Sequence, residues 1–130
     1  MTQLECAKDN VITPLVKKVS VLEHIPAVLL SRYIREGRAV IPYNNTRSLK
    51  KPCAIGYSLR TKINANLGTS TDKSQLKDEI KKLEAAVKYG ADAVMDLSVG
   101  ADIKRVRLEI LRRSPVPVGT VPVYEIAVRA

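Results

Sequence analysis

Polar and sulfur-containing side chains recur at the ends of three short apolar runs, at residues 60–68, 91–98 and 115–124. The first run carries two carboxamides, the second a thioether followed by a carboxylate and a hydroxyl, and the third a phenol. These candidate site residues are Asn64, Asn66, Met95, Asp96, Ser98 and Tyr124. A few convergent polar groups set among apolar side chains are typical of a ligand site, so the repetition predicts that function lies here.

Helical patterns separate the three runs, and this order predicts a β-α-β-α-β arrangement with parallel strands. The carboxyl ends of parallel strands open on one edge, where ligands bind in barrels and open α/β sheets. In the first run, Ile63, Ala65 and Leu67 alternate with polar residues. One face of that strand is therefore predicted to be apolar, and the other to carry both carboxamides near its exit.

The two intervening segments have the period of amphipathic helices. The first is predicted to end near Gly90 and to bury Leu76, Ile80, Leu83 and Val87. Asp102 is predicted to open the second, which would bury Ile103, Val106, Ile110 and Leu111. The strand between them, residues 93–97, is nearly continuous in its apolar character, which is typical of a strand covered on both faces.

Prolines shape the third run. Pro115, Pro117 and Pro122 each lack a backbone donor, which predicts a short strand bounded by rigid turns, or an edge strand. Gly119 and Pro122 would hold the backbone leading to Tyr124 in a defined path, which suits a side chain that reaches a ligand. The alternative is that Tyr124 packs on the following helix.

The chain is predicted to divide into an N-terminal α+β domain, residues 1–58, and residues 59–130, which hold the three runs. In the first part Thr2 and Glu5 have the spacing of a capping box, and Thr13 precedes a proline at a helix start. Two short helices are expected here. The first is predicted to place Leu15, Val16, Val19 and Leu22 on one face, and the second to bury Val28, Leu29, Ile34 or their neighbours.

Two short extended segments complete this first part. The second of its helices should stop at Gly37, and residues 38–42 are predicted to form a brief strand. A loop rich in turn formers follows, and residues 55–56 add a last extended segment.

The chain is basic, with 22 Lys and Arg against 13 Asp and Glu in 130 residues and a net charge of +9. The cations are scattered, and the chain has neither Trp nor Phe to stack on bases, which argues against a nucleic-acid ligand. The charge instead suits attraction of phosphorylated small molecules, or docking on an acidic partner surface.

Cys6 and Cys53 lie far apart and lack the spacing of a zinc or iron–sulfur motif, so they are expected to be free thiols and no metal ligands are assigned. The single histidine, His24, is expected at the surface or at a helix cap. No apolar stretch is long enough to span a bilayer and no signal sequence is evident, which predicts a cytoplasmic protein without membrane contact.

Four segments of the chain resemble the phosphomethylpyrimidine synthase family (ThiC) of thiamine biosynthesis. They read EGRAVIP at 36–42, RTKINANLGTS at 60–70, KYGADAVMDLS at 88–98 and SPVPVGTVPVY at 114–124. The resemblance implies a radical S-adenosylmethionine lyase that converts 5-aminoimidazole ribotide into hydroxymethylpyrimidine phosphate. It also implies a homodimer built on a (β/α)8 barrel.

Carried over position by position, Asn66, Met95 and Tyr124 match the family's ribotide-binding residues. Asn64, Asp96 and Ser98 are additional candidates for the lining of the site. Residues 59–130 would then be the first two and a half β/α units of an incomplete barrel, preceded by a small helical domain.

Members of the family are much longer than this chain. The family's 4Fe-4S cysteine motif, its divalent-metal ligands and most phosphate contacts match no residue here, so no catalytic residue or cofactor is assigned. Two and a half β/α units also leave a strand edge unpaired, which predicts self-association or a C-terminal partner chain. Three hypotheses stay open. The chain is part of the enzyme, whether truncated or one subunit of a split protein; or a shortened paralogue that only binds a phosphorylated imidazole or pyrimidine; or a basic scaffold or nucleic-acid module.

Overall fold

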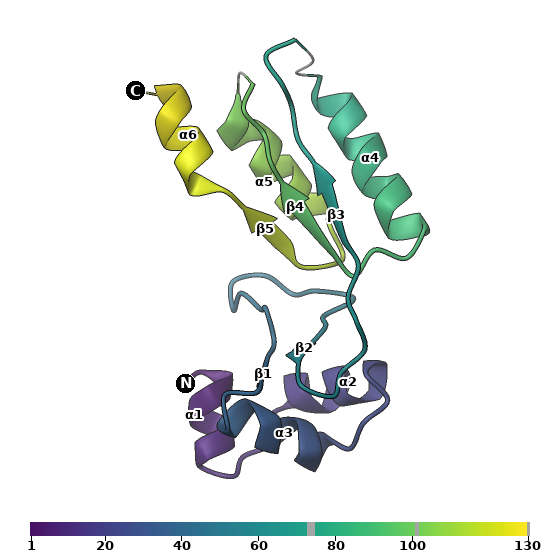
Figure 1. Cartoon of the computed structure of the whole chain (residues 1–130), viewed down its shortest axis with the longest axis vertical. Helices are drawn as coiled ribbons and strands as arrows, with labels where there is room; N and C mark the ends of the chain where they lie inside the picture. Colours follow the sequence, from purple (N-terminus) through teal and green to yellow (C-terminus); the bar gives the residue numbers. More distant parts are fainter. Residues whose placement is uncertain (73–74, 101, 130) are drawn as a thin grey trace. The chain divides into compact units, whose positions relative to one another are not determined.

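A computed structural model of the chain describes residues 1–72, 75–100 and 102–129. Contacts between Cα atoms divide the chain into two compact units (Figure 1). Unit 1 comprises Met1–Ser48 and Pro52–Thr61, and unit 2 comprises Leu49–Lys51 and Lys62–Ala130. Each unit has a hydrophobic cluster of its own.

Unit 1 is built from three short helices and a two-stranded sheet. In chain order its elements are α1 (Gln3–Lys8), α2 (Pro14–Leu22), α3 (Ala27–Arg35), β1 (Ala39–Val40) and β2 (Ile55–Gly56). The two strands pair antiparallel, with Ala39 opposite Gly56. Both short extended segments predicted from the sequence are therefore present.

The helix starts in unit 1 follow the predicted caps. The Thr2 hydroxyl accepts a hydrogen bond from the Glu5 amide, and the Glu5 carboxylate accepts one from the Thr2 amide, which completes the capping box. These hydrogen bonds from Thr2 lower the pKa of Glu5 below its usual value. Thr13 caps α2 by accepting from the Val16 amide. Both caps satisfy backbone donors that an isolated helix leaves open.

The N-terminal prediction was wrong in two details. The first capping box opens a helix of its own, so there are three helices in this part of the chain and not two. Val28 is 70% exposed and Leu22 is 42% exposed, whereas Leu30 is fully buried. The reason is that α3 turns the side of the helix bearing Leu30 and Ile34 toward the cluster, which leaves Val28 on the outer side.

Unit 2 is an α/β layer of three parallel strands with helices following each strand. Its elements are β3 (Asn64–Leu67), α4 (Leu76–Lys88), β4 (Ala93–Asp96), α5 (Ile103–Arg113), β5 (Val118–Thr120) and α6 (Pro122–Arg129). The strand order is β3-β4-β5, and both pairs are parallel. The predicted β-α-β-α-β order and the parallel sense of the strands are confirmed, and all three carboxyl ends point to the same edge (Figure 1).

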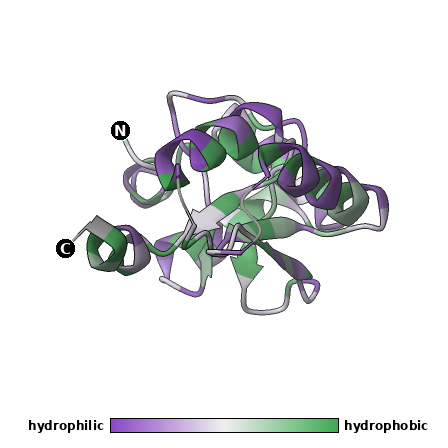
Figure 2. Cartoon of the chain, turned by 90° about the horizontal axis from the view of Figure 1, so that it is seen from above, coloured by the Kyte–Doolittle hydropathy of each residue, from purple (hydrophilic) through white to green (hydrophobic). Residues whose placement is uncertain are grey.

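The core of unit 2 lies between the sheet and helices α4 and α5. Its fully buried members are Leu83, Val94, Val106, Ile110 and Val116, with exposures of 2% or less. The helices show a hydrophobic stripe and a hydrophilic stripe, as expected for elements that cover one face of a sheet (Figure 2). Of the positions predicted to be buried in α4, Ile80 and Leu83 are buried, whereas Leu76 and Val87 are only partly buried against the same cluster.

β4 is not covered on both faces within unit 2. Val94 and Asp96 are buried on the helix side, whereas Ala93 and Met95 are only half-buried on the opposite side. An apolar run of four residues cannot distinguish a strand covered twice from one covered once, because alanine and methionine are tolerated on a half-open face.

The third strand is shorter than the run from which it was predicted. It spans only Val118–Thr120 at the edge of the sheet, as its prolines indicated. Pro122–Arg129 form helix α6, so Tyr124 lies in its first turn and not on a strand. Proline favours this position because its fixed φ suits a helix start and its missing N–H has no acceptor there.

Across the described parts of the chain, the longest helix is α4 with 13 residues, and no helix has both the length and the apolar character needed to cross a bilayer.

Candidate functional site

The sheet of unit 2 presents one face that α4 and α5 do not cover, here called the open face. Because side chains alternate along a strand, Leu67 and Val94 point into the helical core, while Asn66 and Met95 point the other way. Asn66 and Met95 are direct partners in the parallel register, and Met95 is in turn the partner of Gly119. The amide and the thioether are therefore neighbours in one row across the sheet.

Gly119 completes this row by leaving room for the thioether. A Cβ atom at position 119 would lie 2.8 Å from both Sδ and Cε of Met95. The Met95 side chain therefore lies across the backbone of β5, and only a residue without a side chain allows that contact. The sequence interpretation had assigned Gly119 to the path toward Tyr124, and its packing against Met95 was missed.

The two carboxamides of β3 interact with each other. Nδ2 of Asn64 donates to Oδ1 of Asn66 at 3.1 Å, and both side chains are exposed. The oxygen of the Asn66 amide is therefore used within the pair, and its Nδ2 group is the donor that remains. Within the described residues no hydrogen bond to Asn66 Nδ2 is present, so this donor is available to a ligand on the open face.

Asp96 and Ser98 are placed differently from the asparagines. Both are buried, with exposures of 4% and 3%. Oδ1 of Asp96 accepts hydrogen bonds from the Ser98 amide at 3.0 Å and from its hydroxyl at 2.5 Å. Oγ of Ser98 in turn accepts from the Thr69 amide at 3.1 Å. These two residues join the exit of β4 to the exit of β3, and Asp96 faces the helical side of the sheet.

A second buried carboxylate lies at the same strand exits. Glu79 of α4 is 3% exposed, and its Oε2 accepts from the Gly68 amide at 2.7 Å. Its Oε1 forms an ion pair with Lys82 Nζ at 2.5 Å. The sequence interpretation missed Glu79, although one signal was present: an acidic residue stands within the apolar stripe formed by Leu76, Ile80 and Leu83.

Tyr124 lies at the same edge of unit 2 as the strand exits, because it belongs to the first turn of the helix that follows parallel strand β5. Its amide donates to the Val121 carbonyl at 3.1 Å, and its side chain is 40% exposed. The structure therefore brings Asn64, Asn66 and Met95 together on one face and places Tyr124 on a separate element at the same edge.

The thiols of this chain do not fit a metal cluster. Cys6 and Cys53 are both buried in unit 1, and neither forms a disulfide. Among the described residues, no group of three or more His, Cys, Asp or Glu side chains could hold a metal ion. A 4Fe-4S cluster requires at least three thiolates, which these two cysteines do not supply.

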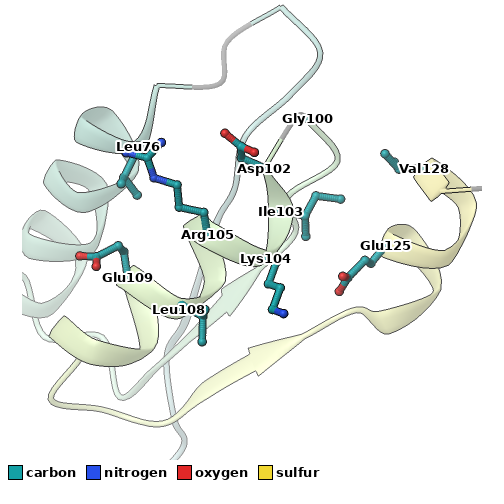
Figure 3. Close-up of a pocket in the computed structure, with 10 residues that line it drawn as sticks. All are labelled: Leu76, Gly100, Asp102, Ile103, Lys104, Arg105, Leu108, Glu109, Glu125 and Val128. Carbon is teal, nitrogen blue, oxygen red and sulfur yellow. The ribbon is translucent and has the colours of Figure 1, made fainter.

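A groove of about 680 Å³ lies on the helical side, away from the open face (Figure 3). It runs beside α5 and is lined by Asp102, Ile103, Arg105 and Leu108 together with Glu125 and Val128 of α6. Asp102 begins α5 as predicted, but it has a left-handed φ of 60° and makes no side-chain capping bond. Hydrogen bonds from Arg112, and then from Arg113, lower the pKa of Glu109 at the border of this groove.

Comparison with known proteins supports the family resemblance of the four sequence segments and extends it along essentially the whole chain. The profile of the Radical SAM ThiC family matches residues 2–130. Phosphomethylpyrimidine synthase of Thermodesulfovibrio yellowstonii is 53% identical over 130 residues, which is 100% of this chain and 30% of that protein. The enzymes of the same name from Moorella thermoacetica and Pyrococcus furiosus are 47% and 46% identical, over 100% and 98% of this chain and 30% of each relative.

The chain thus spans about 30% of the length of the curated relatives that it matches, at their N-terminal end. The four segments that carry the resemblance in sequence all lie inside the matched range. A match over essentially every residue, at identities near one half, identifies the family without reliance on any single motif. The chain belongs to the Radical SAM ThiC family of thiamine biosynthesis.

Proposed function

We propose that this chain supplies part of the ribotide site of a phosphomethylpyrimidine synthase. In this proposal Asn66, Met95 and Tyr124 contact 5-aminoimidazole ribotide, with Asn64 beside them. The observation that carries it is the row on the open face, where Asn66 and Met95 are register partners at the exits of adjacent parallel strands. An amide donor beside a soft, apolar thioether suits a polar heterocycle, which needs hydrogen bonds at its edge and dispersion contacts on its ring.

The described residues bind and orient in this proposal, and they do not carry the radical step. The family's chemistry uses S-adenosylmethionine, and the resemblance further implies an iron–sulfur cluster and a divalent metal. Because the thiols of this chain do not fit a cluster, those groups are assigned to other parts of the enzyme. The family's biosynthetic role also makes the cytoplasm our proposed location.

A calorimetric titration with 5-aminoimidazole ribotide tests the assignment. Asn66→Ala and Tyr124→Phe each remove one polar contact, and each is expected to weaken binding by about 1 to 3 kcal/mol, or roughly 5- to 150-fold. Thermal melts should stay close to that of the unmodified chain, because both side chains are exposed.

Matched variants control for nonspecific effects. Asn45→Ala and Tyr89→Phe change the same residue types at exposed positions, and Tyr89 lies at the end of α4, on the opposite edge of the sheet from the strand exits. Both should bind the ribotide as the unmodified chain does. Equal affinity in all four variants would show that Asn66 and Tyr124 are not ligand contacts.

We also propose that further β/α units complete a barrel around this sheet, on the same polypeptide or on a partner chain. In the described sheet, β5 pairs only with β4. The helix that follows β5 exposes apolar side chains of Val123, Ile126 and Val128, at 59%, 67% and 51%. An open strand edge beside exposed apolar residues is a surface that proteins normally cover.

The chain on its own is therefore expected to self-associate. Multi-angle light scattering should give a mass that rises with concentration toward at least that of a dimer. Replacing Ile126 by glutamate should shift the population toward the monomer, whereas Val28→Glu, at another exposed apolar position, should not. A strictly monomeric mass at high concentration would contradict the proposal.

The binding-only alternative differs from the enzyme hypothesis in one measurable respect. A cluster-bearing C-terminal segment from one of the relatives can be mixed with this chain and tested for reductive cleavage of S-adenosylmethionine. Ribotide-dependent cleavage that requires both components favours the enzyme, whereas ribotide binding without cleavage favours a shortened binding protein. The scaffold hypothesis predicts oligonucleotide binding that falls steeply with salt, and negligible binding at low salt would eliminate it.

A further inference from the structure

We propose that two polar networks, each built on a buried carboxylate, position the open-face row, which makes Glu79, Asp96 and Ser98 positioning residues and not ligand contacts. The first network, called the Glu79 latch, joins Glu79 and Lys82 to Gly68. The second, called the Asp96 latch, joins Asp96 and Ser98 to Thr69. The consequence for ribotide affinity rests on the function proposed above for Asn66 and Met95.

The Glu79 latch binds both the backbone amide and the backbone carbonyl of Gly68. The Glu79 carboxylate accepts from the Gly68 amide at 2.7 Å, and Lys82 Nζ donates to the Gly68 carbonyl at 3.4 Å while it pairs with Glu79. A carboxylate that is only 3% exposed is costly to bury, and an apolar residue of similar volume would stabilise a helix-sheet contact at lower cost. Its specific partners therefore indicate that this group fixes geometry at the exit of β3.

The Asp96 latch ties the exit of β4 to the exit of β3. Asp96 directly follows Met95 in sequence and binds Ser98, whose hydroxyl oxygen receives the Thr69 amide. Backbone pairing continues past the strands on either side of this contact, because the Leu97 amide donates to the Leu67 carbonyl at 2.8 Å and the Val99 amide donates to the Thr69 carbonyl at 2.9 Å. The two latches hold adjacent residues, Gly68 and Thr69.

The latches and the open-face row lie on opposite sides of the same strand ends. Both carboxylates are buried toward the helices, so neither can touch a ligand on the open face. Asn66 is two residues before Gly68, and Met95 is one residue before Asp96. Loss of either latch would therefore increase the mobility of the strand exits next to Asn66 and Met95, and with it the variation in the relative position of these two side chains. Supporting contacts of this kind determine how well a binding site is preorganised.

The proposal can be tested without any ligand by NMR on the 15N-labelled chain. Glu79→Ala leaves the half-buried Gly68 amide without its acceptor, and Ser98→Ala does the same to the buried Thr69 amide. Hydrogen exchange at Gly68 or Thr69, respectively, should accelerate by about tenfold or more. The side-chain NH2 signals of Asn66 should shift or broaden in both variants. Glu79→Gln retains an acceptor for the Gly68 amide and should restore most of the protection.

Glu84→Ala is the matched control, because it removes an exposed carboxylate from the same helix. It should leave the Gly68, Thr69 and Asn66 signals unchanged. All spectra are recorded at a temperature where circular dichroism shows each variant to be folded, so that global unfolding does not contribute.

Ribotide titrations then connect the latches to function. Glu79→Ala and Ser98→Ala should each bind the ribotide about tenfold more weakly than the unmodified chain. The affinities of Glu79→Gln and Glu84→Ala should stay within about twofold of that of the unmodified chain. If the unmodified chain fails to bind the ribotide, the proposed function fails, and the NMR comparison still decides whether the latches position Asn66. Unchanged Asn66 signals in both latch variants, or full affinity despite altered signals, would overturn the proposal.

Discussion

Replacing Gly68 with alanine should lower the free energy of unfolding of unit 2 by about 4 kcal/mol, because overpacking and backbone strain act together. The backbone φ at Gly68 is 149°, which side-chain-bearing residues rarely adopt. An added Cβ would stand 2.6 Å from the Ser98 amide nitrogen and 2.7 Å from the Leu97 carbonyl carbon. Both obstacles are backbone atoms, so they cannot move aside as a flexible side chain could.

Urea denaturation followed through the amide NMR signals of unit 2 measures this loss. Gly90→Ala is the matched control, because Gly90 also has a positive φ, 94°, but a Cβ there meets no atom within 4 Å. That variant should lose only about 1 to 2 kcal/mol, from backbone strain alone. Equal losses in the two variants would mean that the strand exits can separate freely, which would also weaken the case for the latches.

Replacing Ile110 with alanine should destabilise unit 2 by about 3 to 4 kcal/mol, through lost transfer free energy and the cavity left behind. Ile110 is 0% exposed and belongs to the cluster beneath the sheet with Leu83 and Val94. The expected readout is a lower urea midpoint with an unchanged denaturant slope, since the surface exposed on unfolding stays nearly the same.

Leu108→Ala on the same helix provides the comparison. Leu108 is 54% exposed, so its truncation should change stability by no more than about 0.5 kcal/mol. A small loss at Ile110, comparable to that at Leu108, would contradict the placement of the core between α5 and the sheet.

The regular part of unit 2 was predictable because its periodicities are unambiguous. Strand alternation at Ala65 and Leu67 and the helical stripe through Ile80 and Leu83 indicated which faces are buried, and the structure confirms these positions. Ile63, predicted on the same strand face, is instead 62% exposed, because it lies before the start of β3. Parallel strands followed from the intervening helices alone. The shared edge was therefore available from the sequence, whereas the identity of the ligand came only from the family resemblance.

What the sequence did not yield depends on contacts between distant residues. Glu79 meets Gly68 across 11 positions, and Ser98 meets Thr69 across 29, so no local pattern could reveal either latch. Asp96 and Ser98 were assigned to the site lining because they stand at the end of the second apolar run, and only the alternation of β4 shows on which side Asp96 lies. Pro122 was read as a strand boundary because proline at a helix start and proline at a strand end look alike without tertiary context.

Met95 rests on bare β5 backbone, because position 119 carries no side chain. The unbranched methionine side chain has three rotatable bonds. Its thioether can therefore change conformation over this backbone without any movement of the strands. The shape of the open face at this point thus depends on the conformation of one flexible side chain. A side chain introduced at position 119 would restrict the conformations of Met95 without altering any hydrogen-bonding group.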